Sequence, residues 1–194
     1  MSEREVLLTG IGGQGVQLAA QVLARAGVRD GRHVLLFGVY GGAMRGMNTD
    51  ATVVLGDAPV QAPPLLSRAW SAFAMHDRYW APVAPKIAGG GLVIVNDSTF
   101  AAPLDRDRYS VRRVRATELA AELGNDLTAS MVLLGAFVAL TGVVGRDALL
   151  DGMRDSVPAY RRQHLDANEA ALRAGAEAVH GVAVPAWDAA SAPA

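Results

Sequence analysis

The chain has 194 residues, of which 51% are apolar, and a formal net charge of −1. This length is typical of one domain that buries a full core, and the apolar fraction excludes a disordered or collagen-like chain. The near-neutral charge argues against a protein that binds nucleic acid or a membrane surface. The chain has no cysteine, which excludes disulfides, thiolate catalysis and cysteine-bound iron–sulfur clusters on it. The first residues lack a signal-peptide core, so we expect a cytoplasmic protein.

The first predicted strand, residues 5–9, leads into four glycines within six positions and then into an apolar pattern of helical period over residues 13–27. A strand, a glycine loop and a helix form a geometry that cradles phosphate, because glycine permits tight turns and the helix start exposes free N–H groups. The candidate cofactor-binding residues are therefore Gly10, Gly12, Gly13, Gln14 and Gly15.

The second predicted strand, residues 33–39, is followed by a second glycine-rich loop at 40–49. The end of this strand would face the same edge of the sheet as the first loop, where open α/β sheets bind ligands. Arg45 suits a phosphate or a carboxylate, although an interface salt bridge or a solvated arginine explains it equally well. The candidate substrate or partner contacts are Tyr40, Arg45, Gly46 and Asn48.

Further strands are predicted at residues 51–55, 69–75, 92–96 and 109–114. Asp77 is predicted to cap a short helix reaching about residue 87, and longer helices are predicted near 117–124, 127–141, 146–155 and 159–180. Strands that alternate with helices predict an α/β fold: a single three-layer Rossmann-like domain over residues 1–180, with a mostly parallel sheet and a helical C-terminal third. The Ala/Pro/Ser-rich tail, residues 181–194, is predicted to be disordered.

Residues 127–145 form a run of nineteen residues without a charge. Its length would permit a membrane span. The run contains Thr128, Ser130, Thr141 and three glycines and lacks a belt of Trp and Tyr. We therefore predict a central buried helix and no membrane association.

The glycines at 10, 12 and 15 satisfy the dinucleotide fingerprint GxGxxG. That fingerprint also needs an acidic residue at the end of the second strand, and residues 33–39 contain neither Asp nor Glu. A dinucleotide site therefore stays one alternative, and tight strand–helix packing by the glycines is another. A Walker P-loop is excluded because no Gly-Lys-Ser/Thr follows.

The remaining polar residues do not form a self-contained active site. The four histidines show no metal-ligand spacing, and His76-Asp77 fits a helix start better than a catalytic pair. Ser98 and Ser130 lie in no nucleophile-elbow motif. The catalytic residues are thus unknown from the sequence, and no metal site is predicted.

Taken together, these segments resemble the gamma subunit, or gamma domain, of the 2-oxoacid:acceptor (ferredoxin) oxidoreductases, which include the pyruvate, 2-ketoisovalerate and indolepyruvate ferredoxin oxidoreductases. The run from Gly10 to Val16 is similar to the opening motif of that family, and the run from Tyr40 to Gly46 is similar to its second motif. Matching segments continue in order, so the resemblance covers about residues 5–176. The second motif departs from the family at Ala43, where Glu is usual, and at Met47, where Gly is usual.

The resemblance implies a subunit that works within a complex. Thiamine diphosphate with Mg would be bound by the alpha and beta subunits, iron–sulfur clusters would sit on partner subunits, and ferredoxin or a similar carrier would accept the electrons. Coenzyme A would take the acyl group formed by oxidative decarboxylation of a 2-oxoacid, and the gamma component is implicated in contact with coenzyme A. The alternatives are a stand-alone module that binds NAD, FAD or coenzyme A, and a purely structural subunit.

Overall fold

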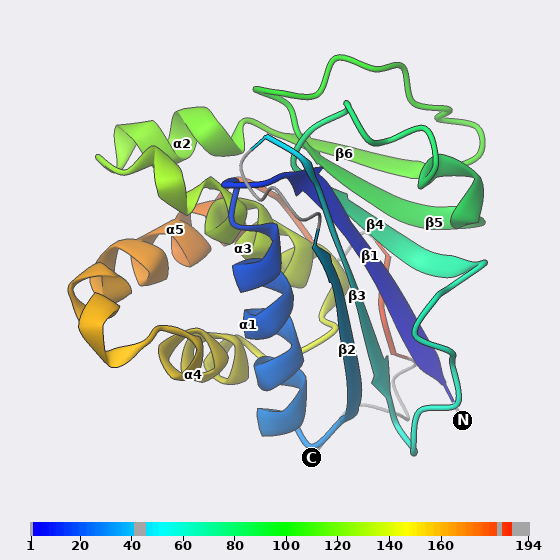
Figure 1. The fold of residues 1–194 in the computed structure, drawn as a ribbon, viewed down its shortest axis with the longest axis horizontal. Helices are drawn as coiled ribbons and strands as arrows, with labels where there is room; N and C mark the ends of the chain where they lie inside the picture. The colour runs from blue at the N-terminus through cyan, green and yellow to red at the C-terminus, as the bar shows by residue number, and fades with distance from the viewer. Residues whose placement is uncertain (1, 41–45, 182–183, 188–194) are drawn as a thin grey trace.

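The structure, a computed structural model, describes residues 2–40, 46–181 and 184–187. Its centre is one six-stranded sheet with the strand order β2-β3-β1-β4-β5-β6 (Figure 1). All strands except β3 run in the same direction, because β3 pairs antiparallel with both β1 and β2 and the remaining pairs are parallel. The strands are β1 (Glu3–Ile11), β2 (His33–Tyr40), β3 (Asn48–Gly56), β4 (Ala69–Ala74), β5 (Ile87–Asn96) and β6 (Ser110–Val114).

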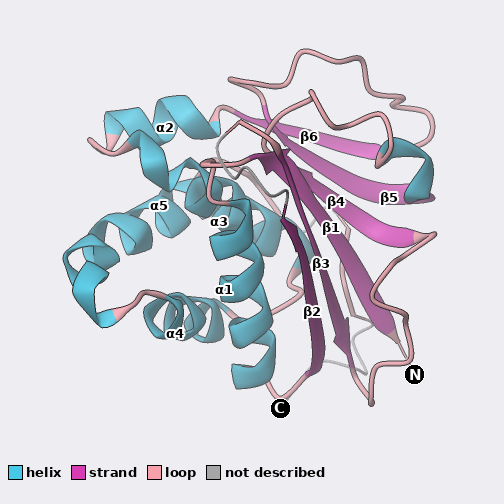
Figure 2. Cartoon of the chain, in the orientation of Figure 1, coloured by secondary structure: helices cyan, strands magenta, loops and turns pink. Residues whose placement is uncertain are grey.

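The five α-helices gather on one face of this sheet (Figure 2). They are α1 (Val16–Arg29), α2 (Ala116–Glu122), α3 (Ala129–Thr141), α4 (Arg146–Ser156) and α5 (Leu165–Glu177). Short 3₁₀ segments occupy η1 (Ala84–Lys86), η2 (Asp126–Thr128) and η3 (Ala159–His164). The mostly parallel α/β fold and the helical C-terminal third predicted from the sequence are confirmed.

The opposite face of the sheet is covered by connecting segments and η1 instead of by α-helices. Trp80 and Phe100 stack edge to face, with ring centroids 5.6 Å apart, and belong to a second apolar cluster on this face. The expected third layer is therefore built from loops. The helix predicted after Asp77 does not form; Pro82 and Pro85 interrupt it, and only the short η1 remains.

The uncharged segment forms α3, whose thirteen residues are buried except for Ala139. None of the helices among the described residues has both the length and the apolar character to cross a membrane. Helix α3 lies between the sheet and α5, which confirms the predicted central buried helix.

Two boundary predictions need correction. The first helix does not end at residue 27, because Gly27 lies inside α1, where its Cα packs on Leu55 and Val34. The long helix predicted at 159–180 is divided into η3 and α5. Within the segment 184–187, Ala186 is fully buried and its N–H donates to the carbonyl of Thr141 at 2.8 Å.

Candidate functional site

The strand order places a topological switch point between β1 and β4. The chain leaves β1 through α1 toward β2 and β3 on one side, and then crosses to β4 on the other side of β1. In open α/β sheets, ligands bind in the crevice at the carboxyl ends of the strands that flank this point. Here those ends carry the first glycine loop after β1 and the turn that begins at Met75 after β4.

The first glycine loop is a tight turn that needs several of its glycines. Gly13 and Gly15 have φ angles of +104° and +78°, in the region that disfavours residues with a Cβ atom. A Cβ on Gly10 would lie 2.8 Å from Val16 and 3.0 Å from Met75. The side chain of Gln14 closes the turn, because its Oε1 accepts the N–H of Ile11 at 2.8 Å.

The two glycine-rich loops predicted as separate motifs touch each other. The N–H of Gly12 donates to the carbonyl of Met47 at 2.8 Å, and the N–H of Gly46 donates to the carbonyl of Gly12 at 3.3 Å. The hydroxyl of Tyr79 donates to the carbonyl of Gly46 at 3.5 Å, which ties the turn after β4 to the same group. The antiparallel register of β1 and β3 produces this meeting, since it sets Ile11 opposite Asn48.

Of the predicted contacts in the second loop, Arg45 lies outside the described residues. The backbone of Tyr40 ends β2 opposite Thr49. Asn48 lies at the start of β3 and donates from Nδ2 to Oδ2 of Asp50 at 2.8 Å, while its own buried Oδ1 has no hydrogen-bond partner among the described residues. The structure thus brings Gly46 and Asn48 to the first loop.

Asp50 is a residue of this site that the sequence analysis missed. Its carboxylate accepts the hydroxyl of Thr9 at 2.7 Å in addition to the amide of Asn48, and its backbone carbonyl accepts from Nε2 of Gln17 at 2.8 Å. Its hydrogen bonds therefore link β1, β3 and the start of α1 to one another. No local pattern distinguishes Asp50 as important, because all these partners depend on strand register.

Ser130, at the start of α3, lies against the N-cap residue of α1. Its side chain is 1% exposed, and its Oγ has no hydrogen-bond partner among the described residues. A Cβ on Gly15 would lie 2.3 Å from that oxygen. An orphaned buried hydroxyl beside a helix N-terminus is a polar group that a ligand or an ordered water could satisfy.

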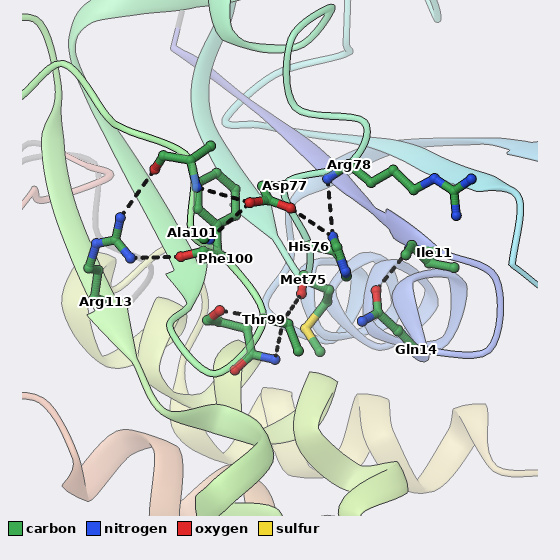
Figure 3. A network of polar contacts seen from close by, with 12 residues as sticks. Ile11, Gln14, Met75, His76, Asp77, Arg78, Thr99, Phe100, Ala101 and Arg113 are labelled. Atoms are coloured by element: carbon green, nitrogen blue, oxygen red, sulfur yellow. Dashed lines mark hydrogen bonds and ion pairs between the residues drawn. The ribbon is translucent and has the colours of Figure 1, made fainter.

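The turn after β4 holds His76 and Asp77, which form no helix start (Figure 3). Oδ2 of Asp77 accepts the N–H groups of Ala101 and Ala102, both at 2.9 Å. Partial burial opposes ionisation of Asp77, but these two donors outweigh it and lower the pKa of its carboxyl below the usual value. Nδ1 of His76 lies 3.0 Å from the other carboxylate oxygen.

Polar contacts also fix the carboxyl ends of β5 and β6. Nδ2 of the fully buried Asn96 donates to the hydroxyl of Thr99 at 2.9 Å and to that of Thr117 at 2.8 Å. Arg113 pairs with Asp97 at 2.7 Å. Because these polar groups bond to one another, they stabilise the loops that follow β5 and β6. The ends of β1 and β4 remain as the candidate binding region.

The glycine loop, the start of α1 and the side chains of His76 and Arg78 lie together at the carboxyl ends of β1 and β4. Within the described residues, no group of three or more side chains could hold a metal ion. The fold and the site thus define a Rossmann-like α/β domain with a glycine-rich turn and a helix start at its switch point.

Comparison with known proteins identifies the family. Residues 5–178 match the family described as pyruvate ferredoxin/flavodoxin oxidoreductase. The chain is 31% identical to the 2-oxoglutarate synthase subunit KorC of Methanothermobacter thermautotrophicus, with 91% of this chain and 95% of that protein covered. It is 28% identical to the pyruvate synthase subunit PorC of the same organism, over 79% and 85% of the two chains.

Among solved structures, the chain is similar to the gamma subunit of a keto/oxoacid ferredoxin oxidoreductase from Geobacter sulfurreducens, with a TM-score of 0.75 and 27% identity over 90% of this chain and 96% of that one. The chain belongs to the pyruvate ferredoxin/flavodoxin oxidoreductase family and is a gamma-type subunit within it. The resemblance drawn from the sequence motifs is confirmed.

Proposed function

We propose that this chain completes the ligand-binding surface of a thiamine-diphosphate-dependent 2-oxoacid:ferredoxin oxidoreductase, a cytoplasmic complex that converts a 2-oxoacid to an acyl-CoA. The main support for the proposal is that the two glycine-rich loops are hydrogen-bonded to each other at the switch point, through Gly12, Gly46 and Met47. A glycine-rich surface that offers backbone N–H donors suits a subunit that works beside a partner's active site.

Coenzyme A is the ligand whose chemistry the site fits. Its phosphate groups need N–H donors, and the N–H groups of Gly13 and Gly15 have no acceptor among the described residues. The orphaned hydroxyl of Ser130 lies behind Gly15. When bound, coenzyme A supplies the thiol that takes the acyl group; the residues of this chain would hold its phosphates and orient it.

The other cofactors belong to partner subunits in this proposal. The chain has no cysteine to hold an iron–sulfur cluster. Thiamine diphosphate binds through a divalent metal, and the described residues offer no cluster of metal ligands. The alpha and beta subunits would therefore provide the decarboxylating centre and the route of electrons to ferredoxin.

Reconstitution tests the proposal. The alpha and beta subunits are purified with and without this chain, and reduction of ferredoxin is followed with 2-oxoglutarate, pyruvate, 2-ketoisovalerate and indolepyruvate, each with and without coenzyme A. We expect one 2-oxoacid to support reduction that depends on coenzyme A and needs this chain. A chain that remains a lone species in its native extract, or a complex equally active without it, would contradict the proposal.

Arg45→Ala in the assembled complex distinguishes a subunit that contacts coenzyme A from a purely structural subunit. If Arg45 contacts coenzyme A, the variant raises the KM for coenzyme A while the subunits still assemble, because a cation that pairs with phosphate is lost. Arg106→Ala is the matched control, since Arg106 is exposed in the connection before β6, at the opposite edge of the sheet. Unchanged kinetics in both variants would leave Arg45 without a chemical role.

A further inference from the structure

Two side chains at the switch point have polar groups that the described residues leave without a partner. His76 and Arg78 follow the carboxyl end of β4, directly beside the first glycine loop: the N–H of Met75 donates to the carbonyl of Thr9 at 2.9 Å. The side chain of His76 is 30% exposed. Arg78 is exposed and has no ion-pair partner among the described residues; its guanidinium lies 5.6 Å from the ring centroid of Tyr79.

The hydrogen bonds of His76 orient its free nitrogen. Nδ1 accepts the backbone N–H of Arg78 at 3.1 Å. Oδ1 of Asp77 lies 3.0 Å from the same nitrogen. Figure 3 shows the ring between Asp77 and the loop of Ile11 and Gln14. Nε2, which has no hydrogen-bond partner among the described residues, is therefore the ring nitrogen left for a ligand, beside the glycine loop.

Asp77 supports this arrangement without filling the crevice. Its Oδ2 faces the N–H groups of Ala101 and Ala102, on the connection between β5 and β6. Its Oδ1 lies beside Nδ1 of His76. Both carboxylate oxygens of Asp77 are therefore directed at groups of this chain, and Nε2 of His76 is left to a ligand.

On the side of the glycine loop, a buried polar group lacks a hydrogen-bond partner among the described residues. Ser130 is 1% exposed, and its unpartnered Oγ points at Gly15, the residue that caps α1. No side chain caps α1 and its first turn contains no acidic residue, so the first N–H groups of this helix are not neutralised from within. The glycine loop thus offers backbone donors, and the turn after β4 offers an imidazole and a guanidinium.

We propose that His76 and Arg78 bind a phosphate group of the ligand at the carboxyl ends of β1 and β4, beside the glycine loop. Nε2–H of His76 would donate to one phosphate oxygen, and the guanidinium of Arg78 would pair with the others. The inference deepens the proposed function, on which it rests for the identity of the ligand. It assigns to the turn after β4 a phosphate contact in addition to those of the two glycine loops.

The test titrates the full-length chain with pyrophosphate and follows the imidazole C–H signals by NMR. The chain has four histidines, so His76→Gln identifies the signal of His76. We expect pyrophosphate to shift this signal saturably while the other three stay in place. Arg78→Gln should weaken the binding of pyrophosphate about tenfold, as for the loss of one charge-assisted contact. Arg78→Lys should recover part of the affinity.

Arg106→Gln and His33→Gln are the matched controls, because both residues are exposed at the opposite edge of the sheet. Both variants should bind pyrophosphate as the natural chain does. If the His76 signal ignores pyrophosphate while the reconstituted complex is active, the inference is wrong and the proposed function stands. If the signal responds as expected but no active complex forms, the phosphate site stands and the proposed function is wrong.

Discussion

The Cα atom of Gly175 on α5 lies against the backbone carbonyl of Val132 on α3, so closely that a Cβ on Gly175 would be 1.8 Å from the carbonyl oxygen. Gly135 on α3 meets the carbonyl of Leu172 in the same way, at 2.0 Å. Both obstacles are backbone atoms, which cannot rotate away as a side chain can. The two helices therefore cross at a distance that glycine alone permits at these positions.

Gly175→Ala should accordingly lower the free energy of unfolding by about 3 kcal/mol or more, since the added methyl group forces α3 and α5 apart. Urea denaturation measures the change. Gly89→Ala is the control, because Gly89 has no atom within 4 Å of its would-be Cβ and does not have a left-handed φ; it should shift the stability by less than about 0.5 kcal/mol. Equal effects of the two substitutions would contradict the close crossing.

The glycine loop allows backbone strain to be separated from crowding. Gly13→Ala introduces a Cβ at positive φ into open space, whereas Gly15→Ala also drives a Cβ into Ser130. We expect about 1–2 kcal/mol of destabilisation for Gly13→Ala and clearly more for Gly15→Ala. Adding Ser130→Ala to the second variant should bring its unfolding free energy back toward that of Gly13→Ala. If Gly15→Ala destabilises the protein no more than Gly13→Ala does, Ser130 does not lie against Gly15.

Asp77→Asn should show a stability difference that depends on pH. The folded-state pKa of Asp77 is lowered, so its carboxylate adds stability above the ordinary carboxyl pKa of about 4 and loses it as the pH falls through the folded value. At pH 7 the variant should be about 1 kcal/mol less stable, a figure that allows for the partial exposure of the group.

Thermal unfolding of both proteins between pH 3 and pH 7 follows this difference, which should shrink below about pH 4. Asp107→Asn is the control, because Asp107 is exposed and its side chain makes no hydrogen bond or ion pair to the described residues. If the difference in stability between the two proteins does not change with pH, the side chain of Asn accepts the same hydrogen bonds and the charge of Asp77 contributes nothing to stability.

Trp187 should anchor the C-terminal segment. Its Nε1–H donates to the carbonyl of Val143 at 2.9 Å, and its ring lies 3.9 Å from the guanidinium carbon of Arg32 and 5.4 Å from that of Arg4. Trp187→Ala should lower the free energy of unfolding by about 2–3 kcal/mol through lost burial and cation–π contact. Leu127→Ala, at an 80% exposed position, should be close to neutral. A neutral Trp187→Ala would mean that the tail does not pack in solution.

Much of the fold could be predicted from local pattern. The apolar runs predicted β1, β3, β5 and α3 within a few residues, and the glycines after residue 9 correctly located the turn into α1. The incorrect predictions concern segments whose conformation depends on residues far away in the sequence. Asp77 was expected to cap the helix that would follow it, but its carboxylate binds N–H groups 24 and 25 residues further along the chain.

The candidate site was predicted only in part for the same reason. The glycine loop could be predicted because positions with positive φ and the starts of helices favour particular residue types. Asp50, His76 and Ser130 belong to no such local pattern. Asp50 gains its partners from the register of β1 and β3, and Ser130 meets Gly15 only when α3 packs beside the start of α1.

By itself, the sequence determined that this is an α/β protein with a glycine-rich turn after its first strand, no cysteine and the motif order of a gamma-type oxidoreductase subunit, because these features depend on residue type and short-range spacing. Only the tertiary structure decided that the α-helices of the described residues lie on one face, that the switch point falls between β1 and β4, and that His76 stands beside the glycine loop. Strand order is set by which apolar faces pack together over long sequence distances, and no local spacing encodes it.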